Sequence, residues 1–139
     1  MFLVNLAQVH YRAFRYRTTL GLYLSAAEIA RKAGAWDDLA RVHTALSSIY
    51  LEFSDANSAL LAIQSAMRAC ARFANAADTA TATLLLEVTL QAATVFSELG
   101  RWRESEELYE DGIERARAMD AHSREAWAWD KLGVSRLKR

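Results

Sequence analysis

The feature that most constrains the fold of this chain is the segment of residues 92–119, whose pattern is typical of two helices joined by a tight turn at Gly100. The first helix ends on apolar residues at helical spacing, namely Ala92, Phe96 and Leu99. The second carries small and large side chains on one face: Trp102, Ser105, Tyr109, Gly112 and Ala116. Residues three and four apart share one side of a helix, so we expect this face to pack closely on the first helix.

Composition extends the helical prediction to the whole chain. The sequence has no proline and only five glycines among 139 residues, and no stretch sustains the apolar–polar alternation of a strand. Hydrophobic residues make up 53% of the chain, enough for a substantial core at the size of one domain. We therefore predict an all-α fold and a single domain, residues 1–139.

A repeated unit recurs at steps of 40, 46 and 40 residues. It consists of an apolar residue followed by a small one, in the pairs Leu6-Ala7, Leu46-Ser47, Ala92-Ala93 and Leu132-Gly133. Tyr50 and Phe96 add an aromatic residue four positions later, and Trp129 precedes Leu132 by three. This pattern resembles the signature of the tetratricopeptide repeat, a helix–turn–helix unit with a Trp, a Leu-Gly pair and further aromatic and small residues at fixed offsets.

The resemblance implies a tetratricopeptide-like α-solenoid of about seven antiparallel helices, that is three and a half hairpins. Its approximate repeats are residues 1–35, 36–74, 75–120 and 121–139, and the first hairpin would consist of helices 2–13 and 17–33 with a turn at 14–16. The repeat is longer than the standard of about 34 residues and lacks the closing proline. It is similar to the extended form of about 40 residues found in kinesin light chains and signalling scaffolds, although another α-solenoid, such as a HEAT-like array, would also accommodate these steps.

Nothing in the sequence indicates catalysis, a cofactor or a metal. The three histidines, His10, His43 and His122, are far apart and show no ligand spacing with each other or with Cys70. No His-Glu-x-x-His, phosphate-binding glycine loop or Gly-x-Ser-x-Gly motif is present. The acidic run at 104–111 lies among arginines and is interpreted as a solvated helix face. We therefore expect a protein that is not an enzyme.

Charge and cysteine content bear on partners and location. Seventeen basic and seventeen acidic residues cancel, so we expect no binding to nucleic acid or to a membrane surface. The most apolar stretch, residues 84–99, is interrupted by polar side chains and is predicted to be a buried helix, too short and too polar to cross a bilayer. A single cysteine and no evident secretory signal favour a cytoplasmic location.

The resemblance also implies where a partner binds, because the first helices of successive hairpins line the concave surface of such an array. On that surface we expect a peptide or a partner helix to contact Tyr11, Arg12, Arg41, Thr44, Ser48, Glu87, Thr94 and Trp127. Packing against a neighbouring helix is an equally good reading for Arg41, Ser48 and Thr94. Opposite charges at Arg41 and Glu87 are predicted to orient the bound segment along this surface.

Two further functional readings follow from particular residues. Proteins of this family clamp the acidic tails of chaperones with basic residues, but one clamp position here holds Glu87, which would repel a carboxylate, so this function is disfavoured. The alternative to peptide binding is a structural, self-associating subunit. It would form a homo-oligomer through its C-terminal helix, whose residues Trp127, Trp129, Leu132 and Leu137 are expected to lie uncovered near the end of the array.

Overall fold

The computed structural model describes the backbone of residues 2–73 and 78–138, and the side chains within these ranges from Arg15 onward. These residues form helices and turns with no strand, so the predicted all-α class is confirmed. The helices are α1 (Phe2–Ala33), α2 (Trp36–Glu52), α3 (Ala56–Cys70), α4 (Thr79–Glu98), α5 (Trp102–Ala118) and α6 (His122–Lys138).

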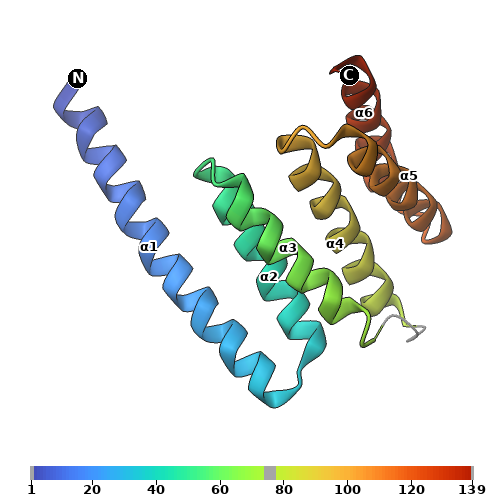
Figure 1. Cartoon of the computed structure of the whole chain (residues 1–139), viewed down its shortest axis with the longest axis horizontal. Coiled ribbons are helices and arrows are strands. Elements are labelled where there is room, and N and C mark those ends of the chain that lie inside the picture. Colours follow the sequence, from blue (N-terminus) through green and yellow to red (C-terminus); the bar gives the residue numbers. More distant parts are fainter. Residues whose placement is uncertain (1, 74–77, 139) are drawn as a thin grey trace.

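The first predicted hairpin is wrong, because α1 runs without a break for 32 residues, and the described chain has six helices where about seven were predicted. Residues 14–16 contain no glycine, proline or capping side chain, so nothing there ends a helix. The Tyr16 ring lies 3.8 Å from the Phe53 ring, centroid to centroid, just beyond the end of α2. The part of α1 that precedes Tyr16 therefore extends past α2 (Figure 1).

The turn predicted at Gly100 is present, and the ends of the other helices have recognisable chemistry. Gly34 and Gly100 have φ angles of +68° and +74°, the left-handed conformation that commonly ends a helix and that glycine adopts without strain. Asp55 Oδ1 accepts a hydrogen bond from the Ser58 amide at 3.1 Å, and Asp78 Oδ1 accepts one from the Thr81 amide at 2.6 Å. Asp55 thus caps the start of α3, and Asp78 caps the start of α4.

Each helix packs antiparallel to the next one in the chain, and α2 also packs against α4, with α3 intervening in sequence (Figure 1). One buried cluster contains residues of α1, α2, α3 and α4, and a second contains residues of α4, α5 and α6. Small residues sit at the closest contacts: Ala59 and Ala66 of α3 are fully buried. A Cβ atom on Gly112 would stand 2.5 Å from Leu90 Cδ2, so the absence of a side chain at this position of α5 makes room for Leu90 of α4.

Among the described residues, α4 alone is long and apolar enough to span a membrane, by length and composition only. It contains 20 residues, more than the apolar stretch recognised in the sequence, because it begins at Thr79. Half of its apolar window is buried inside the fold, against neighbouring helices. The core helix of a soluble protein meets the same criterion.

Candidate functional site

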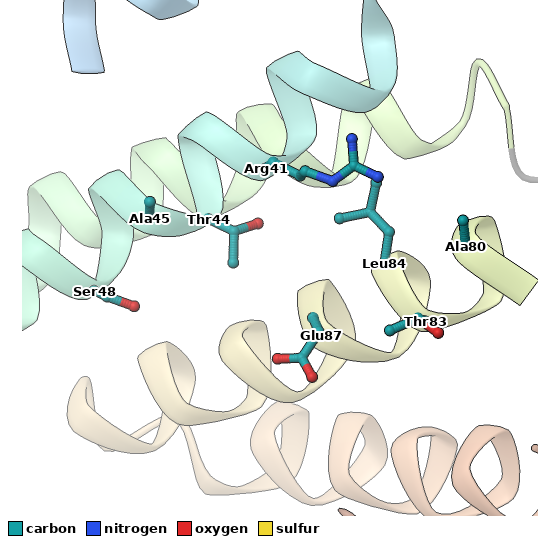
Figure 2. A pocket seen from close by; sticks show the side chains of 8 residues that line it. All are labelled: Arg41, Thr44, Ala45, Ser48, Ala80, Thr83, Leu84 and Glu87. Atoms are coloured by element: carbon teal, nitrogen blue, oxygen red, sulfur yellow. The ribbon is translucent and has the colours of Figure 1, made fainter. Parts of the chain in front are cut away.

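A groove lies between α2 and α4, with a volume of about 530 Å³ (Figure 2). We call it the α2–α4 groove. Its lining residues from α2 are Arg41, Thr44, Ala45 and Ser48, and those from α4 are Ala80, Thr83, Leu84 and Glu87.

The lining follows from the same spacing on both helices. Each set of four residues occupies positions i, i+3, i+4 and i+7, which lie on one side of an α-helix. The groove is therefore formed by two matched stripes, one from each helix. Most of the side chains in it are short, and this leaves an open volume where larger side chains would have closed the contact.

A part-buried hydrogen bond links the two helices next to the groove. Gln91 Nε2 of α4 donates to Ser47 Oγ of α2 at 3.0 Å, and Ser47 Oγ in turn donates to the Thr44 carbonyl oxygen at 2.7 Å. Ser47 is fully buried, and Leu84 in the groove is 7% exposed and belongs to the core cluster. The groove thus rests on a packed contact between α2 and α4.

The two sides of the groove carry charges of opposite sign. Arg41 lies on α2 and Glu87 on α4 (Figure 2). Arg41 Nη1 is 3.3 Å from Asp38 Oδ1 and 3.6 Å from Asp37 Oδ2, whereas Glu87 Oε1 is 2.5 Å from Nη2 of Arg124 on α6. The two charged groups are therefore already paired within the chain. The α2 side of the groove carries the positive charge of Arg41, and the α4 side carries the negative charge of Glu87.

Four of the eight residues predicted to bind a peptide line this groove together: Arg41, Thr44, Ser48 and Glu87. The side chains of two others, Tyr11 and Arg12, lie outside the described residues; both belong to the part of α1 that extends past α2. The remaining two, Thr94 and Trp127, are not among the residues lining the groove.

Thr94 and Trp127 both lie against Tyr109 of α5. Thr94 Oγ1 donates to the Leu90 carbonyl oxygen at 3.0 Å. Burial raises the pKa of Tyr109, while hydrogen bonds with Thr94 and Ser105 lower it in part. The Trp127 ring meets the Tyr109 ring edge-on, with centroids 6.0 Å apart. These two predicted residues thus contribute to the contact among α4, α5 and α6.

Four lining residues were not predicted: Ala45, Ala80, Thr83 and Leu84. The α4 group was missed because the sequence reading began its inward face only at Glu87. Leu84, Thr83 and Ala80 precede Glu87 by three, four and seven positions and therefore share its side of the helix. This spacing could have identified them from the sequence.

His43 and Cys70, two side chains that could carry chemistry, have the surroundings of packed residues. No cluster of three or more His, Cys, Asp or Glu side chains that could hold a metal occurs in the part of the chain that the structure describes. Burial lowers the pKa of His43, as does the charge of Arg68, and burial raises the pKa of the Cys70 thiol. A less reactive thiol and a neutral imidazole are typical of packed side chains.

Comparison with known proteins finds no match to any family model, to any curated protein or to any solved structure.

Proposed function

We propose that this chain is a non-enzymatic interaction scaffold, built from tetratricopeptide-like helical repeats, that binds an extended peptide or a partner helix in the α2–α4 groove. The observation that carries the proposal is the groove itself. It lies between α2 and α4, which pack against each other although α3 separates them in the sequence. It contains four residues that the repeat pattern had assigned to a binding surface.

The arrangement of the helices supports the repeat interpretation. Leu46, Ala92 and Leu132, the described members of the repeated apolar position, are 1%, 0% and 1% exposed. The pairs α2–α3 and α4–α5 are antiparallel hairpins, and the first helices of the two pairs pack against each other. In an α-solenoid the first helices of successive hairpins form one layer in this way.

The chemistry of the groove favours a ligand with a small apolar anchor. Alanine side chains, threonine methyl groups and Leu84 supply apolar surface, and Ser48 and the threonine hydroxyls supply polar atoms at its edge. A volume of about 530 Å³ is in the range of ordinary ligand sites. Exposed ion pairs contribute only about 0–1 kcal/mol each, so Arg41 and Glu87 would orient the ligand more than hold it.

The proposal can be tested without knowing the natural partner. A random peptide library displayed on phage is selected against the wild-type chain, and enriched peptides are assayed on Ser48→Trp. Ser48 is exposed and lines the groove, so an indole there occupies the groove without disturbing the core. Ser65→Trp places the same side chain on α3, where Ser65 is partly exposed and is not among the groove residues.

We expect the enriched peptides to lose at least tenfold in affinity on Ser48→Trp and to bind Ser65→Trp as they bind wild type. Circular dichroism of the two variants provides the control for folding. If the peptides bind both variants equally well, the α2–α4 groove is not the binding site.

A further inference from the structure

The two charged residues of the α2–α4 groove do not pair with each other. Of the described residues that line the groove, Arg41 is the one basic residue and Glu87 is the one acidic residue. Each side chain forms an ion pair within the described part of the chain, but no ion pair there joins Arg41 to Glu87. The two side chains are thus held apart by their other partners, and the groove is open between them.

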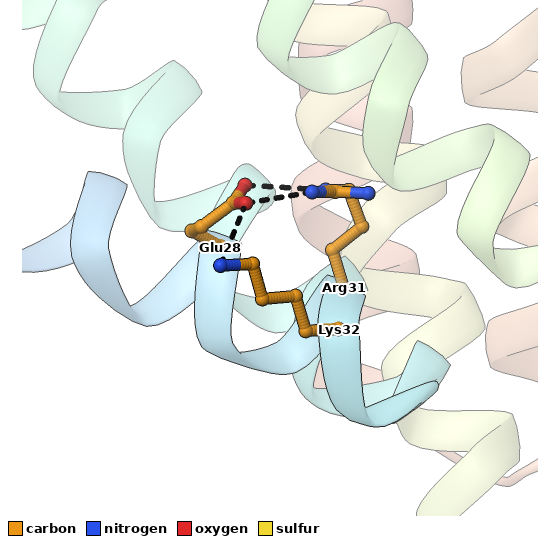
Figure 3. Close-up of polar contacts among 3 residues, drawn as sticks. All are labelled: Glu28, Arg31 and Lys32. Atoms are coloured by element: carbon orange, nitrogen blue, oxygen red, sulfur yellow. Dashed lines mark hydrogen bonds and ion pairs between the residues drawn. The ribbon is translucent and has the colours of Figure 1, made fainter.

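Arg41 is held along its own helix. Its Nη1 atom lies 3.6 Å from Asp37 Oδ2 and 3.3 Å from Asp38 Oδ1, and both acids belong to the first turn of α2. Glu28 of α1 pairs in the same way with basic residues three and four positions later in its helix (Figure 3). A guanidinium has five N–H donors. Within the described residues Nε and Nη2 of Arg41 donate no hydrogen bond, so this side chain can accommodate a further carboxylate.

Glu87 is held toward α6. Its Oε1 atom lies 2.5 Å from Nη2 of Arg124, in the first turn of α6, and this ion pair joins two helices that α5 separates in the chain. Figure 2 shows the Glu87 carboxylate directed away from Arg41. Arg124 itself is not among the residues lining the groove. The next residue, Glu125, pairs with Arg117 of α5, so the start of α6 is tied both to α4 and to α5.

We propose that Arg124 is a positioning residue for the α2–α4 groove: it holds Glu87 on the α6 side and so prevents an ion pair between Glu87 and Arg41. Without Arg124, the carboxylate loses its partner, and the donor atoms of Arg41 lie on the same groove. A pair between them would extend two long side chains across the apolar surface between α2 and α4. The inference rests on the proposed function, because it concerns access to the ligand site, and it gives α6 control of a groove that α6 does not line.

The exposure of this ion pair sets the size of the effect. The side chains of Arg124 and Glu87 are 52% and 37% exposed. Ion pairs at such positions are weak and are screened by salt, and replacing either residue leaves the core intact. Arg124 should therefore change ligand affinity by a few-fold without being needed for folding.

A binding cycle measures this role. Peptides selected from the phage library against the wild-type chain are assayed on Arg124→Gln, which removes the charge and keeps a polar side chain. We expect affinity to fall about twofold to fivefold, the range for which one exposed ion pair can account. In a Glu87→Gln background, which cannot form an ion pair with Arg41, Arg124→Gln should have no further effect. Arg136→Gln, which breaks an exposed ion pair between α6 and Glu110 of α5, is the matched control and should bind as the wild type does.

Unfolding free energies test the same claim without a ligand. A double-mutant cycle of Arg41→Gln and Glu87→Gln should be additive in the wild type, where the two side chains do not pair. The same cycle in an Arg124→Gln background should show a favourable coupling between residues 41 and 87, because Glu87 is then free to pair with Arg41. Urea denaturation measures both cycles, and circular dichroism verifies that each variant is folded.

The inference is overturned if Arg124→Gln binds the peptides as the wild type does, or if the unfolding cycle is additive in both backgrounds. It is also overturned if the loss of affinity persists in Glu87→Gln, since Arg124 would then act on the peptide directly. If Ser48→Trp leaves peptide binding unchanged, the proposed function fails by itself. The unfolding cycle still decides in that case whether Arg124 keeps Glu87 from Arg41.

Discussion

At the scale of single residues, this fold depends on small side chains at helix contacts. Ala59 and Ala66 of α3 are fully buried, and so is Ala92 of α4. Close-packed helices have little room for larger side chains, so these positions are sensitive to volume.

Enlarging either alanine should destabilise the fold. Ala59→Leu and Ala66→Leu insert a larger side chain into a packed contact, which typically lowers the free energy of unfolding by about 1–3 kcal/mol. Ala126→Leu makes the same change at an exposed position of α6 and should alter it by no more than about 0.5 kcal/mol. Urea denaturation measures all three, and equal stability of the buried and exposed variants would contradict the packing described here.

His43 should make stability depend on pH. Burial and the charge of Arg68 lower its pKa in the folded state, and its buried Nδ1 has no hydrogen-bond partner in the described structure. As the pH falls through the unfolded value of about 6.5, the unfolded chain binds a proton that the folded chain does not, so stability is lost. Above the unfolded-state pKa of about 6.5, His43 is neutral in both states and this loss of folding free energy is absent.

We therefore expect the urea midpoint of the wild type to fall more between pH 7.5 and pH 5.5 than that of His43→Gln. Carboxylates with lowered pKa values, such as Asp55 and Asp78, lose their contribution at more acidic pH and are common to both proteins. Parallel pH profiles of the two proteins would show that His43 is not the group responsible.

At the scale of elements, the sequence predicted a helix end where a glycine marks it and failed where a break had no chemical marker. The turn at Gly100 was recognised because glycine readily adopts the left-handed conformation that ends a helix. The proposed turn at residues 14–16 had only repeat spacing in its favour, and the backbone there continues as helix. Half of the candidate site was found because Arg41, Thr44 and Ser48 share one stripe of α2. The hydrogen bond between Thr94 and Tyr109 depends on how α5 packs on α4, which the spacing within one helix does not predict.

The continuity of α1 predicts a long separation between residues 8 and 25. Seventeen residues of α-helix span about 26 Å, whereas a hairpin folded at 14–16 would bring the two positions to roughly 10 Å. Spin labels at Gln8→Cys and Ser25→Cys, in a Cys70→Ala background, allow the distance to be measured by double electron–electron resonance. A distribution centred on the shorter distance would contradict a continuous α1.

The pairing of α2 with α4 should be measurable as a coupling energy. Gln91 and Ser47 form a hydrogen bond across the contact, while Ser47 is also bonded within its own helix. In a double-mutant cycle with Ser47→Ala and Gln91→Ala, we expect a coupling of about 0.5–1.5 kcal/mol in unfolding free energy. Additive effects of the two substitutions would indicate that the helices are not held together by this bond.

At the scale of the whole molecule, the six helices of the described residues follow one another as antiparallel neighbours. The first helices of two successive pairs, α2 and α4, leave the α2–α4 groove between them. The proposed peptide binding uses this groove.

The most direct test of the central claim is to map the binding surface of a library-selected peptide on the folded chain by amide chemical-shift perturbation. The account predicts that the largest shifts fall on residues 41–48 of α2 and 80–87 of α4, with small shifts in α3. Largest shifts on α3 or α5, with α2 and α4 unaffected, would contradict the account.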